Sequence, residues 1–286
     1  MRRVRSLVAG VATAIILCGV GVGALIARGD DERTLSFYNI HTKETSTVVY
    51  MRGGKRDPEA MKQINWIMRD WRRNEPTTMD PELIDLIWEV HAELGSKEPI
   101  HLISGYRSPD TNENLRRTQG GQAKNSRHTL GKAADIHFPD VPIKQLRYSG
   151  LVRQRGGVGY YPTSGVPFVH LDTGNVRHWP RVPRYELALL FPDGNSKHVP
   201  ADGRPLTRQD HITAKSRYQD LAQQVAAFFD LRSAAKTSRT LVADAGGSPA
   251  RNTGGWSPAV ATQPAAKATA AAVTAGADPA PARVAA

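Results

Sequence analysis

The chain has 286 residues but only one cysteine, Cys18. A single cysteine excludes an intramolecular disulfide framework. Cys18 also lies inside an apolar segment near the start of the chain, and Leu17 before it is not the small residue that a lipoprotein anchor needs. The chain beyond this apolar segment therefore contains no thiolate that could serve as a nucleophile or as a metal ligand. Any metal site must therefore be built from His, Asp and Glu.

Acidic residues are also in short supply. The chain has 27 Asp and Glu against 38 Lys and Arg, which gives a formal net charge of +11. Nucleic acid is one partner of basic proteins, but the basic residues here are scattered and form no basic helix or aromatic–basic stripe. We therefore expect no nucleic-acid partner. An anionic polymer of the cell envelope, or a membrane surface, accounts for the charge better.

A long stretch near the start of the chain contains no charged residue. Residues 7–27 are apolar and follow Arg2, Arg3 and Arg5, which is typical of a secretory signal or a signal anchor. The stretch reaches the roughly 20 residues that span a bilayer, and no clean A-x-A cleavage site follows it. We expect residues 1–33 to direct export to the periplasm or cell envelope, either as a cleaved leader or as an inner-membrane anchor. The Arg2–Arg3 pair leaves the Sec and twin-arginine routes both open.

The other end of the chain has few large side chains to bury. From residue 233 to residue 286 the sequence is rich in Ala, Thr, Pro, Gly and Ser, which predicts a disordered tail. Residues 209–232 are predicted to form an amphipathic helix, because Tyr218, Leu221, Val225 and Phe228 recur at helical spacing. This helix either docks on the domain or faces a partner or a membrane. The foldable domain is then 34–208.

Within 34–208 the pattern of elements is uneven. Residues 34–51 predict a β-hairpin, and Asp57-Pro58 and Asp80-Pro81 each predict the start of a helix, the first over 58–72. Short strands are expected at 100–103, 133–138 and 166–172, with helices at about 110–117 and 142–153. Strands and helices that alternate this irregularly favour an α+β fold, which we expect to contain a small antiparallel sheet with flanking helices.

Two histidines and one aspartate carry the clearest chemical signal. His128 and Asp135 lie in one short segment, and His170 lies in the middle of an apolar strand. A lone histidine in such a strand is usually a core residue with satisfied hydrogen bonds. Two imidazoles and a carboxylate together, however, can hold zinc and leave its fourth position to water, as hydrolytic zinc sites do.

Several motifs resemble a known family. Ser104-Gly-Tyr-Arg-Ser108, His128-x-x-Gly131-x-Ala-x-Asp135 and the strand histidine resemble zinc DD-peptidases related to D-Ala-D-Ala carboxypeptidases and to the hedgehog fold. The segments 156–162 and 168–174 add a resemblance to a bacterial subgroup of murein endopeptidases. The resemblance covers about 34–208 and neither end of the chain.

The resemblance implies roles for individual residues. His128, Asp135 and His170 are expected to bind Zn²⁺, and Arg107 is expected to stabilise an oxyanion or to clamp a substrate carboxylate with its planar fork. Three further residues are expected to contact substrate: Ser126, Tyr106 and His178.

The general base is where the sequence departs from the family. Better-known relatives carry Glu or Asp about three residues before the strand histidine, and this chain has Pro167 there. Asp172 is the nearest carboxylate, and alternation along a strand places it on the same face as His170. We expect Asp172 to act as the base or to orient His170; His178 is a second candidate for the base.

These observations predict an exported zinc peptidase that hydrolyses the peptide cross-links of peptidoglycan. Two alternatives remain. One is a non-catalytic peptidoglycan-binding module that keeps the fold and the metal but lacks a base. The other is a zinc D,D-carboxypeptidase, dipeptidase or amidase that acts on soluble peptides.

Overall fold

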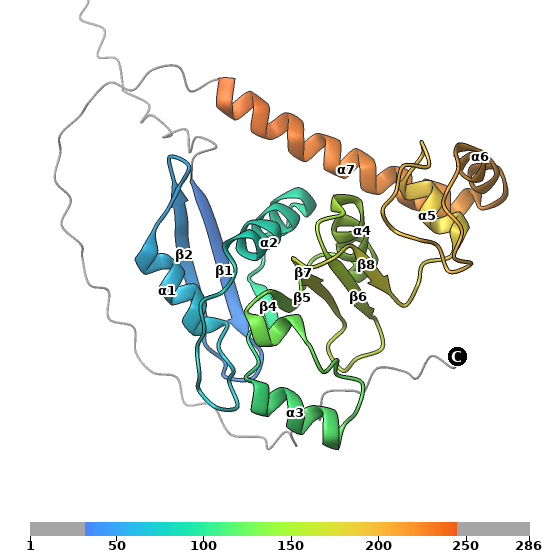
Figure 1. The fold of residues 1–286 in the computed structure, drawn as a ribbon. Coiled ribbons are helices and arrows are strands. Elements are labelled where there is room, and N and C mark those ends of the chain that lie inside the picture. Colours follow the sequence, from blue (N-terminus) through green and yellow to red (C-terminus); the bar gives the residue numbers. More distant parts are fainter. Residues whose placement is uncertain (1–31, 245–286) are drawn as a thin grey trace, which may run out of the picture.

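A computed structural model describes residues 32–244 (Figure 1). The predicted leader, including the apolar run 7–27 and Cys18, and the part of the predicted tail after residue 244 lie outside the described residues. Among the helices that the structure describes, none has the length and apolarity needed to cross a membrane.

Within residues 32–244, eight strands form one mixed sheet in the order β3-β2-β1-β4-β5-β7-β6-β8. The strands are β1 (Arg33–Asn39), β2 (Thr45–Arg52), β3 (Lys55–Arg56), β4 (Ile100–Ser104), β5 (Ala133–His137), β6 (Gly157–Tyr161), β7 (Phe168–Asp172) and β8 (Arg177–Trp179). The helices are α1 (Pro58–Ile67), α2 (Pro81–Leu94), α3 (Pro109–Thr118), α4 (Ile143–Arg153), α5 (Arg184–Leu190), α6 (Arg208–Arg217) and α7 (Gln219–Asp244), with a 3-10 helix η1 (Arg127–Leu130).

The α+β class is confirmed, but the expectation of a small antiparallel sheet is wrong. The sheet has eight strands, and the pairs β1–β4 and β6–β8 are parallel. Parallel neighbours need a long crossover connection, which β2, α1 and α2 provide between β1 and β4. The predicted hairpin is β1 and β2, which pair antiparallel.

The helices begin where the sequence predicts. The side chain of Asp57 accepts hydrogen bonds from the backbone N–H groups of the first turn of α1, and Asp80 does the same for α2. Gly95 ends α2 in the left-handed conformation, at φ 66°. Helix α1 stops at Ile67 rather than at residue 72, because the chain turns there and residues 70 and 75 form an isolated β-bridge.

One face of the sheet packs against helices and forms the core. Strand residues that point to this face are fully buried, among them Phe37, Leu102, Ile136 and Leu171. Helix α2 contacts β1 and β7, and α4 contacts β6 and β7. Successive residues of a strand point to opposite faces, so Asp135, His170 and Asp172 lie on the other face of the sheet.

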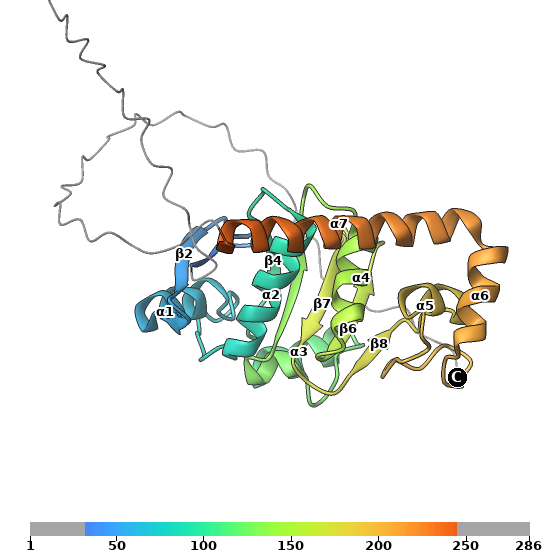
Figure 2. The same cartoon turned by 90° about the horizontal axis from the view of Figure 1, so that it is seen from above.

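The C-terminal segment is two helices, not one. The chain leaves the helical conformation at Tyr218, whose ring stacks on Tyr185 at a centroid distance of 4.1 Å, and this separates α6 from α7. Figure 2 shows α7 lying across α2 and α4, and Val225 and Phe228 join the hydrophobic core. Helix α7 therefore docks on the domain. It continues to Asp244, past residue 233 where the tail was predicted to begin, because this stretch contains neither Gly nor Pro.

Candidate metal centre

Three separate elements bring His128, Asp135 and His170 together. Asp135 on β5 and His170 on β7 are directly opposite in the antiparallel register, which places their side chains side by side. His128 comes from η1, where Ser126 accepts a hydrogen bond from the His128 backbone N–H and Gly131 ends the turn at φ 65°. The register of β5 and β7, together with the tight turn of η1, thus determines the positions of the three side chains.

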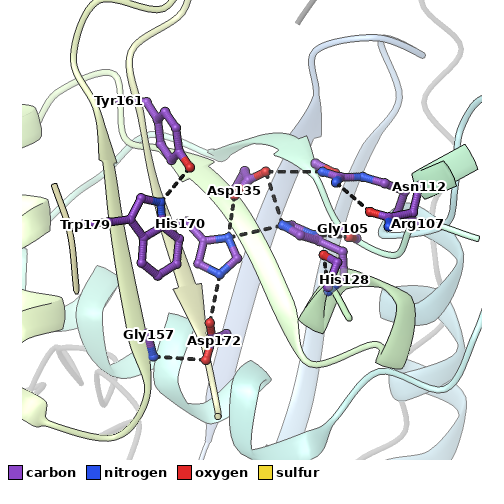
Figure 3. A network of polar contacts seen from close by, with 12 residues as sticks. Gly105, Arg107, Asn112, His128, Asp135, Gly157, Tyr161, His170, Asp172 and Trp179 are labelled. Atoms are coloured by element: carbon purple, nitrogen blue, oxygen red, sulfur yellow. Dashed lines mark hydrogen bonds and ion pairs between the residues drawn. The ribbon is translucent and has the colours of Figure 1, made fainter. Parts of the chain in front are cut away.

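The three side chains converge at short distances. One ligand atom from each lies within 4.8 Å of the others, and all three residues are buried. Nδ1 of His170 lies 2.9 Å from Oδ1 of Asp135 and 3.1 Å from Nε2 of His128, and Nε2 of His128 lies 3.3 Å from Oδ2 of Asp135. Figure 3 shows the two rings and the carboxylate pointing at one another.

The opposite ring nitrogens are held by hydrogen-bond acceptors. Nδ1–H of His128 donates to the carbonyl of Gly105 at 2.7 Å, and Nε2–H of His170 donates to Asp172 at 2.9 Å. In neutral rings the facing nitrogens, Nε2 of His128 and Nδ1 of His170, then both carry lone pairs. Two lone pairs and a carboxylate that face one another repel unless a cation or a shared proton lies between them. Two imidazole nitrogens and one carboxylate, each ring anchored by a second partner, fit a zinc ion.

Burial and mutual contact shift the pKa values in the cluster. Burial lowers the pKa of His128, whereas hydrogen bonds to Asp135 and Asp172 outweigh the effect of burial on His170 and raise its pKa. Burial opposes the charge of Asp135, but the two imidazoles hold its pKa well below its usual range. The carboxylate is therefore ionised and available as a ligand.

Asp172 lies behind His170, away from the other two ligand residues. Its side chain has no exposed surface, and Oδ1 accepts hydrogen bonds from the backbone N–H groups of Gly157 and Gly174. Arg177 donates to both carboxylate oxygens, at 3.1 and 2.6 Å. Although burial opposes ionisation, His170, Arg177 and the backbone donors hold the pKa of Asp172 well below its usual range.

A cleft of about 290 Å³ opens over the cluster. Arg107 lines it, donates to Asn112, and holds Nη2 3.9 Å from Asp135. The cleft-lining residues are Ile103, Ser104, Arg107, Gly121, Gln122, Ala123, Asn125, Ser126, Arg127, His128, Asp135, Tyr161, Phe168, His170, Arg177 and Trp179. Arg107 and Ser126, both predicted from the sequence, are thus placed beside the ligand cluster.

Two residues predicted to contact substrate do not line the cleft. Tyr106 packs into the core, and its hydroxyl lies 3.4 Å from a carboxylate oxygen of Glu75. His178 points to the other face of the sheet, where its Nδ1 lies 3.2 Å from Nδ1 of His198. The physical reason for His178 is strand alternation: in β8, Arg177 and Trp179 face the cleft and His178 between them faces the interior.

Arg127 and Arg177, for which no role was predicted, also line the cleft. The position of Arg127 directly before the ligand residue His128 could have indicated that it lies near the cleft. For Arg177 the indication is strand alternation, because neighbouring residues of β8 point to opposite faces of the sheet. Trp179 donates from its indole N–H to the hydroxyl of Tyr161 at 2.7 Å, and the centroid of its ring lies 5.0 Å from that of the His170 ring.

Comparison with known proteins gives a consistent set of matches. Residues 27–179 match a family model described as peptidoglycan L,D-endopeptidase MepK. The chain is 42% identical over 147 residues to the peptidoglycan L,D-endopeptidase MepK of Escherichia coli K12, and the alignment covers 51% of this chain and 80% of that protein. The protein of the same name from Shigella flexneri gives the same identity and coverage. No solved structure matches the chain.

Proposed function

The chain belongs to the family of the peptidoglycan L,D-endopeptidase MepK, and from this premise we propose that it is a zinc-dependent endopeptidase that hydrolyses peptide cross-links of peptidoglycan. The observation that carries the proposal is the convergence of His128, Asp135 and His170 at the floor of a cleft. A cleft open to solvent above three ligand atoms provides room for both a water molecule and a peptide.

A zinc ion bound to these residues would supply a water of pKa about 7 and a Lewis acid that polarises the scissile carbonyl. The remaining steps fall to the chain itself. The Arg107 guanidinium, near Asp135, is placed to donate hydrogen bonds to the oxygen of the tetrahedral intermediate. Trp179 and Tyr161 both line the cleft, and the hydrogen bond between them fixes the position of their rings.

We assign Asp172 the role of orienting His170 rather than of accepting a proton from water. Both of its oxygens are engaged by His170, Arg177 and backbone N–H groups, and its side chain is inaccessible from the cleft. Among the residues that line the cleft, Asp135 is the one carboxylate. His178 is not placed for the role of base either, because it faces the interior.

Digestion of purified sacculi tests the proposal. The full-length protein with zinc should release soluble muropeptides, a chelator should stop the release, and added zinc should restore it. Mass analysis should show cross-linked dimers converted into monomers, which neither a carboxypeptidase nor a dipeptidase would do. His170→Ala should be inactive and His211→Ala, on α6, should be active. Intact sacculi in the presence of zinc would instead favour a binding module.

Peptidoglycan lies outside the cytoplasm, so the proposal also requires export. The basic, apolar segment at residues 1–33 supports this location in the periplasm or cell envelope, with or without an inner-membrane anchor. Cell fractionation followed by N-terminal sequencing tests it. A protein recovered from the cytoplasm with its first residues intact would contradict it.

A further inference from the structure

Arg127 presents a positive charge to the cleft, and the carboxylate of Asp172, on the other side of Gly174, already pairs with Arg177. Arg127 lines the cleft and is half-buried, and no ion pair forms between it and any described Asp or Glu. The other two arginines of the cleft are compensated: Arg177 pairs with Asp172 at 2.6 Å, and Arg107 lies 3.9 Å from Asp135. Arg127 is thus the one cleft arginine that has no ion pair with a described carboxylate, and its guanidinium is available to an anionic ligand.

The backbone and the neighbours of Arg127 hold it in place. Its carbonyl accepts a hydrogen bond from the N–H of Lys132 at 3.0 Å, and it directly precedes the ligand residue His128. The guanidinium lies against Gly174, where even a methyl group would come within 2.6 Å of Nε of Arg127. Gly174 in turn donates its N–H to Asp172. The backbone of Arg127 is therefore fixed relative to the ligand cluster, and its guanidinium lies beside Gly174.

The cleft as a whole is cationic. Three guanidinium groups surround the ligand cluster, against the carboxylates of Asp135 and Asp172. A bound divalent cation would add further positive charge. Such a site attracts anionic groups and rejects cationic ones.

We propose that Arg127 is a specificity-determining residue that binds a free carboxylate of the substrate peptide beside the scissile bond. The inference rests on the proposed function, because it concerns the peptide bound in the same cleft. A guanidinium binds a carboxylate through two parallel hydrogen bonds, and the resulting pair is stronger than a neutral hydrogen bond. A carboxamide at the same position cannot form this charged pair. The preferred substrates are thus cross-linked stem peptides with an unmodified carboxylate near the bond that is cut.

A pair of cross-linked muropeptides, identical except that one carries a carboxamide in place of that carboxylate, tests the proposal. The wild-type protein should cleave the carboxylate form with a kcat/KM about ten- to a hundredfold higher, mainly through KM. Arg127→Gln should cleave both forms equally and with similar kcat. Arg127→Lys should keep part of the preference, since the charge remains and the fork is lost. Arg116→Gln, an exposed arginine of α3 that pairs with Glu113, removes the same charge outside the cleft and should behave as wild type.

Binding without turnover provides an independent readout. Titration calorimetry of the metal-free protein with the carboxylate-bearing product peptide should give a Kd about tenfold lower for Arg116→Gln than for Arg127→Gln. Equal affinity in these two variants, or equal cleavage of both substrates by the wild-type protein, would overturn the proposal. If the wild-type protein with zinc cleaves neither substrate, the proposed function fails, and the difference in Kd still decides whether Arg127 binds the carboxylate.

Discussion

Nε2 of His170 lies 2.9 Å from Oδ2 of Asp172, a carboxylate whose side chain is completely buried. Gly157, Gly174 and Arg177 donate to the same carboxylate and fix its position. Because the carboxylate cannot move, the imidazole cannot turn, and Nδ1 stays directed at Asp135. The sheet thus orients a ligand ring through a carboxylate that no substrate touches.

Replacing this carboxylate should weaken metal binding. Asp172→Asn keeps the volume of the side chain but removes the charge that holds Nε2–H, and its amide N–H₂ group opposes the donors of Arg177 and Gly157. Metal affinity should fall about ten- to a hundredfold, as for other partners of ligand histidines. Competition against a chromogenic chelator measures the change.

Asp110→Asn is the matched control, because Asp110 is an exposed residue of α3 outside the cleft. It should leave the metal affinity unchanged. If Asp172→Asn binds zinc as tightly as the control but loses turnover, Asp172 acts as a base and not as an orienting residue.

The ligand cluster could be predicted from the sequence because the residue types themselves indicate metal binding. With Cys18 as the single cysteine, the ligand types are few, and His128, Asp135 and His170 occur in motifs that resemble a family with that ligand set. The structure brings all three together. What the sequence could not supply is the register of β5 and β7, which places Asp135 opposite His170. Pairing between strands that lie far apart in the chain depends on packing of the whole sheet, not on local pattern.

The direction of the side chain explains why Tyr106 and His178, both predicted to contact substrate, do not line the cleft. Tyr106 belongs to a motif that reaches the cleft through Arg107, but its own ring turns into the core. His178 alternates with Arg177 and Trp179, and one residue of strand register decides which of them faces the cleft. The two parallel strand pairs were missed for a related reason, since neither β1–β4 nor β6–β8 is joined by a short turn.

Metal binding should stabilise the fold. A ligand that binds only the folded state stabilises it by about 3 kcal/mol at a concentration a hundred times its Kd. Thermal unfolding with added zinc should therefore show a Tm about 5–10 °C above that measured with chelator. His170→Ala should lose this difference. An identical Tm of the wild-type protein with zinc and with chelator would mean that His128, Asp135 and His170 do not hold the ion.

The pair His178 and His198 should make stability depend on pH. Burial, together with the charges of His198, Arg147 and Arg181, lowers the pKa of His178 from 6.5 to about 4. Between these values the unfolded chain binds a proton that the folded chain does not, so stability is lost as pH falls from 6.5 to 4. The loss should reach up to about 3 kcal/mol. Urea unfolding at pH 7 and 4.5 should show a smaller difference for His178→Gln, and an equal difference would contradict this origin.

Helix α7 should contribute to the stability of the whole domain. The ring of Phe228 is completely buried and packs edge-on against Tyr148 of α4 at a centroid distance of 5.8 Å. Phe228→Ala should lower the free energy of unfolding by about 3–5 kcal/mol, since it removes buried area and leaves a cavity. Ile212→Ala on α6, where the side chain is 53% exposed, should change it by less than about 0.5 kcal/mol. Equal stability of these two variants in urea would mean that α7 detaches in solution, and the helix would then be available to a partner or a membrane.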